Sequence, residues 1–159
     1  MLGVSATTTL AADYLMTLHA PIAGAPQCID DTLTIFHSDI GTVEGPRIKG
    51  RILAPTGDWL RAMPGGSLRV DARMSIETDD GAQIHVQYCG VIAIAPTDFA
   101  RMAAGETLGA DEMHFVTAPL FQTGDDRYAW LNRVQAIGKA VALKGGGGGF
   151  VRYDVFAMR

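Results

Sequence analysis

Residues 69–91 read RVDARMSIETDDGAQIHVQYCGV, and this stretch decides the fold of the chain. Apolar residues alternate with polar ones over residues 69–78 and again over residues 84–89, which is the period of a half-buried β-strand. Between the two runs stands Thr78-Asp79-Asp80-Gly81, and Asp-Gly is a strong signal for a tight turn. The stretch therefore predicts one antiparallel hairpin.

Short apolar runs separated by glycine-rich turns continue on both sides of this hairpin. They predict further strands at residues 13–20, 31–38, 46–53, 113–122, 130–139 and 150–157. One helix is predicted over residues 96–108, with Thr97 or Asp98 capping its first turn and Gly105 ending it early. Gly145–Gly149 follow Lys144 without side chains to pack, which predicts a flexible hairpin loop.

About eight strands and one short helix indicate an all-β fold. A chain of 159 residues is usually one domain, so we expect a single domain over residues 1–159. Many short strands with glycine-rich turns are typical of a sandwich or a closed barrel. We expect an antiparallel β-barrel of about eight strands, because a barrel of that size is filled by side chains or holds one small ligand.

The composition argues against several classes of function. A formal net charge of −4 and scattered basic residues do not suit a protein that binds nucleic acid. No segment approaches the roughly 18 consecutive apolar residues of a membrane-spanning helix. The N-terminus lacks the basic start of a signal peptide, so we expect a cytoplasmic protein without a membrane partner.

Cysteine and histidine spacing gives no sign of a metal site. Cys28 and Cys89 form no Cys-x-x-Cys pair, and no two of the four histidines have the spacing of ligands within one element. A site built from separate strands stays open. Because the dinucleotide-binding glycine motif and the serine-hydrolase elbow are also missing, we expect neither metal nor organic cofactor.

Both tryptophans belong to short motifs that contain polar side chains. In Gly57-Asp58-Trp59, Asp58 is a candidate general base or ligand anchor and Trp59 a stacking surface. Alternatively, the motif is a turn in which Trp59 closes one end of the barrel. In Tyr128-Ala129-Trp130-Leu131-Asn132, strand alternation places Trp130 and Asn132 on one face. They either line a pocket with Tyr128, or Trp130 is a core residue and Asn132 bonds to a nearby backbone group.

The charged face of the hairpin also has two possible positions. Arg69, Asp71, Arg73 and Glu77 either face solvent or point into the barrel. In the second case Arg73 is the natural counter-ion for a carboxylate or an enolate. Asp80 belongs to the turn motif, where aspartate is favoured for backbone reasons.

Several of these motifs together resemble the family known as domain of unknown function 3237. They are, in order, Gly45-Pro46-Arg47-Ile48-Lys49-Gly50, Gly57-Asp58-Trp59, Thr78–Gly81, Thr123–Asn132 and the last strand Val151-Arg152-Tyr153-Asp154-Val155. The resemblance spans about residues 10–157. It implies a single β-barrel similar in shape to the allene oxide cyclase and dirigent barrels, which bind small apolar molecules inside. For the family itself it implies no settled activity.

One strand departs from the pattern of this family. His114-Phe115-Val116-Thr117 stands where the family tends to show Tyr-Phe-Arg-Thr, and Leu120-Phe121-Gln122-Thr123 where it tends to show Arg-Phe-Glu-Thr. If this strand lines the cavity, the pocket suits a ligand of low charge. His114 is then the added group that can carry a proton near neutral pH.

These observations lead to one functional hypothesis with two alternatives. We expect a cofactor-independent lyase, isomerase or cyclase acting on an apolar cyclic or aromatic carbonyl compound. Its catalytic candidates are Asp58, His114 and Arg73, and its substrate-binding candidates are Trp59, Val116, Leu120, Gln122, Tyr128, Trp130 and Asn132. The alternatives are a non-catalytic carrier or sensor, and a structural barrel with a filled lumen. Because little helix covers the strands, we also expect a homo-oligomer, with a dimer as the first guess.

Overall fold

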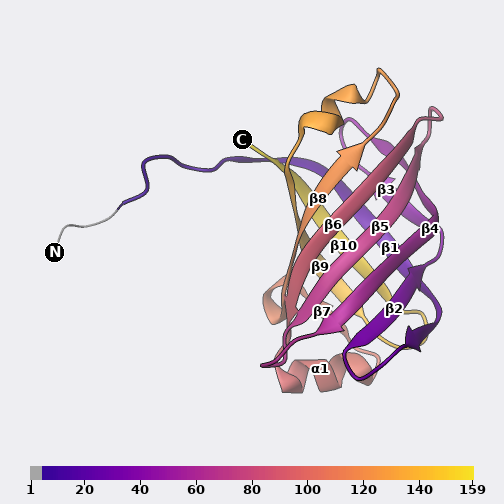
Figure 1. Ribbon diagram of the computed structural model, residues 1–159, viewed down its shortest axis with the longest axis vertical. Helices are drawn as coiled ribbons and strands as arrows, with labels where there is room; N and C mark the ends of the chain where they lie inside the picture. Colours follow the sequence, from indigo (N-terminus) through magenta and orange to yellow (C-terminus); the bar gives the residue numbers. More distant parts are fainter. Residues whose placement is uncertain (1–4) are drawn as a thin grey trace.

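The computed structural model describes residues 5–159, and its strands form a closed antiparallel barrel (Figure 1). Around the ring the order is β10, β1, the pair β2 and β3, then β4, β5, β6, β8 and β9, which pairs with β10. The expected barrel of about eight strands is confirmed, with β2 and β3 sharing one position between β1 and β4. The strands are β1 (Ala12–Cys28), β2 (Leu33–Ser38), β3 (Gly41–Glu44), β4 (Lys49–Ala62), β5 (Leu68–Thr78), β6 (Gln83–Ala93), β7 (Thr107–Gly109), β8 (His114–Gln122), β9 (Ala136–Lys144) and β10 (Phe150–Met158).

The predicted hairpin of residues 69–91 is confirmed. β5 and β6 pair without interruption from Leu68 opposite Ile92 to Glu77 opposite Gln83. At the turn, the backbone N–H of Ala82 donates to the hydroxyl of Thr78 at 2.8 Å. Gly81 has a φ of 87°, a left-handed conformation that side chains other than hydrogen disfavour. The turn chemistry seen in the sequence therefore fixes the register of the two central strands.

The segment after β8 differs from the sequence prediction. Instead of opening a strand over 130–139, residues Ala129–Arg133 form a short 3₁₀ helix, η2, and β9 begins at Ala136. The side chain of Asn132 turns back and hydrogen-bonds to both backbone groups of Thr123, at 2.8 and 2.9 Å. Asparagine side chains that bond to backbone in this way compete with strand pairing. The strand predicted at 46–53 also runs further than expected, to Ala62.

The predicted helix is present as α1 (Pro96–Ala103), which lies across one end of the barrel (Figure 1). Gly105, with a φ of 93°, follows its end as expected. Thr97 and Asp98 lie inside the helix, and the N-cap is Ala95, which makes no side-chain cap. Pro96 explains this shift, because proline is favoured at the first helical position. A second 3₁₀ turn, η1 (Ala110–Glu112), precedes β8.

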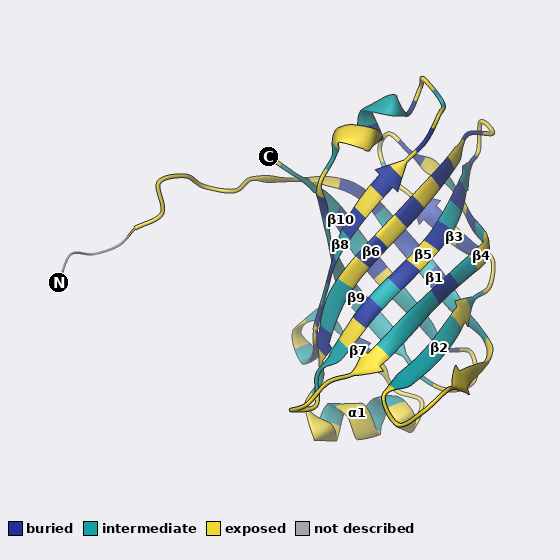
Figure 2. Cartoon of the chain, viewed as in Figure 1, coloured by how far each residue is buried: buried dark blue, intermediate teal, exposed yellow. Residues whose placement is uncertain are grey.

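Inward and outward residues alternate along the strands, as the banded burial in Figure 2 shows. At one end, near η2, large apolar side chains fill the barrel; those almost fully buried include Met16, Ile52, Ile76, Ile84, Val86 and Leu131. None of these lines the cavity at the other end, whose wall includes Phe99 and Met102 of α1. The barrel is thus packed in one half and hollow in the other.

The described residues form one continuous sheet, and residues 1–4 of the predicted domain 1–159 lie outside them. The loop Gly145–Gly149 joins β9 to β10 as a hairpin connection. Cys28 and Cys89 are both exposed and form no disulfide. None of the helices within residues 5–159 has the length and hydropathy needed to cross a lipid bilayer.

Candidate active site

The hollow half of the barrel holds a cavity of about 350 Å³. This volume lies within the roughly 300–1,000 Å³ usual for small-molecule sites. Most of the wall is apolar and comes from the strands and from α1; the apolar side chains are Ile22, Phe36, Leu60, Leu68, Met74, Ile92, Ile94, Phe99, Met102, Phe115, Leu143 and Val151. Such a wall suits a flat, apolar ligand and keeps water away from the few polar groups it encloses.

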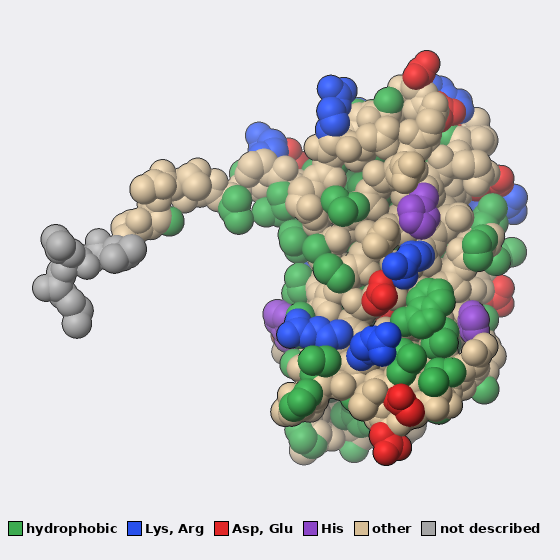
Figure 3. Space-filling view, in the orientation of Figure 1, with side chains coloured by type: hydrophobic (Ala, Val, Ile, Leu, Met, Phe, Trp, Pro, Cys, Tyr) green, Lys and Arg blue, Asp and Glu red, His purple; other side chains and the backbone are tan. Residues whose placement is uncertain are grey.

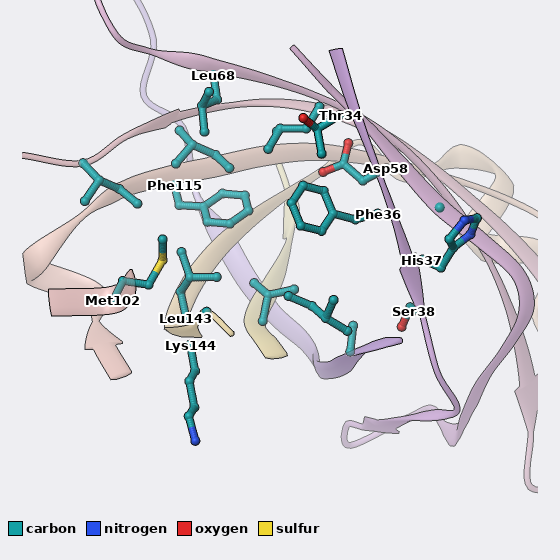
Figure 4. Close-up of a pocket in the computed structure, with 18 of the residues that line it drawn as sticks. Thr34, Phe36, His37, Ser38, Asp58, Leu68, Met102, Phe115, Leu143 and Lys144 are labelled. Carbon is teal, nitrogen blue, oxygen red and sulfur yellow. The ribbon is translucent and has the colours of Figure 1, made fainter. Parts of the chain in front are cut away.

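Asp58 is the carboxylate of this wall. It lies on β4 between Phe36 of β2 and Ala72 of β5, and Figure 4 shows its side chain beside Phe36 and Thr34. Its Oδ1 accepts one hydrogen bond, from the backbone N–H of Asp71 at 3.0 Å. Burial raises the pKa of Asp58 to about 6, and the negative charge of Asp71 adds to this rise while the hydrogen bond opposes it. A carboxyl with this pKa can both take and give a proton near neutral pH.

Two tyrosines share the cavity with Asp58. Tyr88 of β6 and Tyr153 of β10 are both buried, and their ring centroids lie 6.0 Å apart in an edge-to-face arrangement. Tyr153 also packs edge-to-face on Phe115, at 5.3 Å. Burial raises the pKa of both hydroxyls, and the charge of Asp58 raises them further. Both therefore remain protonated at neutral pH and can donate hydrogen bonds.

Other polar groups also line the cavity. Thr32, Thr34, Ser38 and Thr56 contribute hydroxyls, and Asp31 is exposed at the edge. In Figure 4 the ammonium of Lys144 extends away from the cavity. His37 extends to the far side of β2, where its Nε2 lies 3.0 Å from Nε2 of Gln27. Among the described residues, Asp58 is thus the charged side chain placed within the apolar wall.

The side chains of Asp58 and Trp59 in the motif Gly57-Asp58-Trp59 point to opposite faces of β4. Asp58 faces the cavity, but Trp59 lies half-buried on the outer face, over Gly57. Arg73 is on this outer face too, 5.7 Å from the Trp59 ring and ion-paired with Asp71 at 3.0 Å. The expectations that Trp59 and Arg73 face the ligand are therefore not met. The cause is parity, because Ala72 is buried inside and its neighbour Arg73 must point out.

The same parity corrects the expectation for β8. Phe115, Thr117 and Phe121 are buried, so the alternate residues face outward. These outward residues are His114, Val116, Leu120 and Gln122, none of which lines the cavity. Burying a phenylalanine releases more free energy than burying a histidine, so the phenylalanines set the phase of the strand.

The remaining predicted residues, Tyr128, Trp130 and Asn132, belong to η2 and the residue before it, and none of them lines the cavity. The segment that holds them lies at the end of the barrel opposite α1 (Figure 1). Tyr128 donates from its hydroxyl to Asp80 Oδ1 at 3.0 Å, and the hydroxyl of Thr78 donates to the same oxygen at 2.6 Å. The hydrogen bond from Thr78 is the main reason why the pKa of Asp80 is lowered. Trp130 stacks under the guanidinium of Arg47 at 3.8 Å. Asn132 holds Thr123 through two hydrogen bonds, and neither it nor Tyr128 or Trp130 lines the cavity.

Sequence reasoning missed Tyr88 and Tyr153 as functional candidates. Tyr88 continues the inward alternation of Ile84 and Val86, a pattern that does not distinguish a core residue from a residue of the cavity wall. The sequence does contain one sign of Tyr88, namely a tyrosine hydroxyl at an inward-facing position of a central strand. Tyr153 carries the same signal on the last strand. Sequence alone does not show that both lie beside Asp58, because β4, β6 and β10 are far apart along the chain.

Within the described part of the chain, no group of three or more His, Cys, Asp or Glu side chains is placed to hold a metal ion.

Comparison with known proteins adds the family. Residues 7–158 match the family model described as "Protein of unknown function (DUF3237)". The chain belongs to this family. It is similar to the UPF0311 protein RPA1785 of Rhodopseudomonas palustris, with 30% identity over 138 residues, covering 84% of this chain and 90% of that one. This DUF3237 member thus matches its relative over most of both lengths.

Solved structures show the same fold. The crystal structure of the R. palustris protein has a TM-score of 0.84 and 27% identity, covering 96% of this chain and all of that one. A β-barrel-like protein from Acinetobacter baumannii has a TM-score of 0.77 and 27% identity, with coverage of 97% and 99%. A structure described as an enzyme from Penicillium herquei has a TM-score of 0.62, with coverage of 98% and 99%. At 21% identity, that last likeness concerns the fold alone.

Proposed function

We propose that this DUF3237 protein is a cofactor-independent lyase, isomerase or cyclase that acts on an apolar cyclic or aromatic carbonyl compound in the barrel cavity. The observation that carries the proposal is Asp58, a carboxyl with a pKa of about 6 inside an apolar wall. Groups with strongly shifted pKa values in clefts are candidates for acid–base catalysis. A barrel of the same fold in Penicillium herquei is described as an enzyme, which is consistent with the proposal.

Asp58 is the acid–base group of the proposed reaction. In its ionised form it removes a proton from carbon or oxygen of the ligand, and in its protonated form it returns one. A pKa close to the working pH serves both steps, and such transfer contributes on the order of a hundredfold to ten-thousandfold in rate. The apolar wall excludes water, which keeps the carboxylate weakly solvated and therefore more basic.

A methyl ketone offers a direct test of proton transfer without knowledge of the natural substrate. We expect the protein to accelerate exchange of the acetyl protons of 2-acetylnaphthalene for deuterium in heavy water, followed by NMR. Asp58→Asn should lower this rate at least a hundredfold and leave binding of the ketone within about twofold. Since the ionised carboxyl is the base, the wild-type rate should rise with pH through about 6 and then level off.

A carrier or sensor is the second candidate, and the mostly apolar lining with few polar groups favours it. A carrier binds 2-acetylnaphthalene with no exchange above the buffer rate, in wild type and Asp58→Asn alike. The third reading, a structural barrel with a filled lumen, has little support. A filled lumen would bring large side chains such as Trp59 and Trp130 inside, but these lie against Arg73 and Arg47 outside the cavity, whose volume is about 350 Å³.

A further inference from the structure

We infer that the ligand of this cavity carries no negative charge, and that its oxygen accepts a hydrogen bond from the hydroxyl of Tyr88, which Tyr153 orients beside Asp58. The inference rests on the proposed function, because it assigns the ligand of that same site. It adds two binding residues and excludes a large class of ligands, the organic acids.

The charge of the wall sets the first condition. The charged group that influences Asp58 most directly is Asp71, a second carboxylate, and no cation among the described residues contributes to the pKa of Asp58. Arg73, the nearest arginine along β5, faces outward and is ion-paired with Asp71. Lys144 extends away from the cavity (Figure 4). A carboxylate ligand would therefore lose its hydration next to a like charge with no counter-ion to replace it.

The hydroxyls set the second condition. Tyr88 lies opposite Ala72 of β5, which in turn lies opposite Asp58 of β4, so Tyr88 and Asp58 project into the cavity from one row of the barrel. The ring of Tyr153 packs edge-to-face on Tyr88, with ring centroids 6.0 Å apart, and its hydroxyl is close enough to affect the pKa of Tyr88. Burial keeps the pKa of the Tyr88 hydroxyl high, so Tyr88 retains a proton that it can donate to an acceptor in the cavity. Neither hydroxyl hydrogen-bonds to Asp58, although the carboxylate is close enough to raise the pKa of both. The space between Tyr88 and Asp58 thus has a donor on one side and a base on the other.

An uncharged, enolisable carbonyl compound matches this arrangement. When Asp58 removes the proton next to the carbonyl, the C–H bond breaks and an O–H bond forms on Asp58. The electron pair moves into the enolate, whose oxygen is held by the Tyr88 hydroxyl. Because burial keeps the pKa of Tyr88 high, Tyr88 donates a hydrogen bond without losing its proton. Return of the proton to carbon, or departure of a leaving group, completes the step without an oxidant or a reductant.

A pair of probes of nearly equal shape tests the charge condition on the wild-type protein. Equilibrium dialysis at about pH 8 compares 2-acetylnaphthalene with 2-naphthoate, in which a carboxylate replaces the acetyl group. We expect 2-naphthoate to bind on the order of a hundredfold more weakly than the ketone. Asp58→Asn should recover most of that loss. Equal binding of the two probes by the wild type would overturn the inference.

Infrared spectroscopy tests the role of Tyr88, since a hydrogen bond lowers the stretching frequency of a carbonyl. With carbonyl-labelled 2-acetylnaphthalene, we expect a lowered frequency in the wild type that returns toward the free value in Tyr88→Phe. Binding should weaken about tenfold. Tyr153→Phe should shift the band part of the way. Tyr14→Phe, on the outer face, is the matched control and should leave the band unchanged. An unchanged band in Tyr88→Phe would refute the assignment.

The two proposals fail separately. Absence of deuterium exchange in the wild type removes the proposed catalysis, whereas the naphthoate comparison and the carbonyl band judge the ligand class on binding alone.

Discussion

Asp58 occupies a position that folding alone does not favour. Burying a carboxylate with a single backbone hydrogen bond and no cation costs free energy, and the raised pKa is a measure of that cost. Elsewhere in the protein, acidic groups such as Asp80 and Glu112 have lowered pKa values because they accept several hydrogen bonds. Residues that work against stability in this way are concentrated at functional sites.

Replacing this carboxyl should therefore stabilise the protein in a pH-dependent way. The groups around Asp58 are Asp71 on β5, Tyr88 on β6 and Tyr153 on β10, none of them cationic. Asp58 binds its proton more tightly in the folded state, so its ionisation destabilises the fold as pH rises from about 4 through about 6. Asp58→Asn, whose Oδ1 can still accept from Asp71, should gain up to about 3 kcal/mol at about pH 8 and nothing at about pH 3.

Urea unfolding of both proteins across this pH range measures the difference directly. A gain that stays the same at every pH would show that Asp58 has an ordinary pKa.

At this scale the sequence indicates Asp58, which lines the cavity, but gives no sign that Tyr88 and Tyr153 line it too. The motif Gly57-Asp58-Trp59 is a candidate because a tryptophan next to a carboxylate suits a pocket wall, but only Asp58 faces the cavity, and Trp59 lies on the outer face. The two faces were not assigned, because both Asp58 and Trp59 have apolar and polar neighbours in sequence. Arg73 and His114 lie on the outer face, whereas the inward positions of the cavity hold the uncharged hydroxyls of Tyr88 and Tyr153, as burial favours.

Among the elements, the turn of the β5–β6 hairpin is the most sharply specified. Gly81 has a φ of 87°, whereas Gly124 has room for a side chain and no such backbone constraint. We expect Gly81→Ala to destabilise the protein by about 1 kcal/mol or more, because alanine is strained at this φ. Gly124→Ala should be neutral or slightly stabilising. Thermal unfolding of the two variants gives the comparison, and equal melting temperatures would contradict it.

One arginine of helix α1 forms an ion-pair network with the segment that follows the helix. Arg101 binds Asp98 at 3.0 Å, Glu106 at 2.9 Å and Glu112 at 2.7 Å. Glu112 in turn accepts from the N–H of Gly109 at 2.7 Å. Because no residue of α1 is fully buried, this exposed network and the contacts of Met102 hold the helix over the cavity.

Arg101→Met should loosen α1 with little effect on global stability, since each exposed ion pair contributes about 0–1 kcal/mol. We expect several-fold faster amide hydrogen exchange in residues 96–103 and faster release of 2-acetylnaphthalene. Arg152→Met on β10 is the matched control and should change neither. If exchange in α1 stays at the wild-type rate, the network does not hold the helix.

The elements were predictable where their signals are local. The hairpin follows from alternation and an Asp-Gly turn within 23 residues, and the end of α1 follows from Gly105. Alternation predicts a strand at Ala129–Arg133, but the segment forms a 3₁₀ helix. Its structure depends on a hydrogen bond between Asn132 and Thr123, nine residues away. Alternation of apolar and polar residues does not reveal such a bond.

At the scale of the whole molecule, the division into a packed and a hollow half decides where a ligand can bind. Leu143 lines the hollow half, whereas Leu120 is 53% exposed on the outer face. We expect Leu143→Trp to fill the cavity and to weaken binding of 2-acetylnaphthalene at least tenfold, because the larger ring occupies the same space. Leu120→Trp should bind the ketone like the wild type. Equal affinity in both variants would place the binding site elsewhere.

The sequence indicated a closed barrel but not how it closes. β1 pairs with β10 from the other end of the chain, and β2 and β3 divide one position of the ring between them. Pairings between distant segments leave no mark in a single sequence, so the position of the cavity relative to α1 was not predictable. The expected homo-oligomer remains a prediction, which analytical ultracentrifugation would test.

The asymmetry between the two halves has a consequence for how such a protein changes over generations. Residues such as Met16, Ile52 and Leu131 are packed on all sides, while partly buried side chains of the cavity wall, such as Leu60 and Leu143, face open space on one side. Exchanges in the hollow half therefore alter what the barrel accepts at small cost to its integrity. Proteins with this barrel can acquire new ligands one substitution at a time while the packed half stays the same.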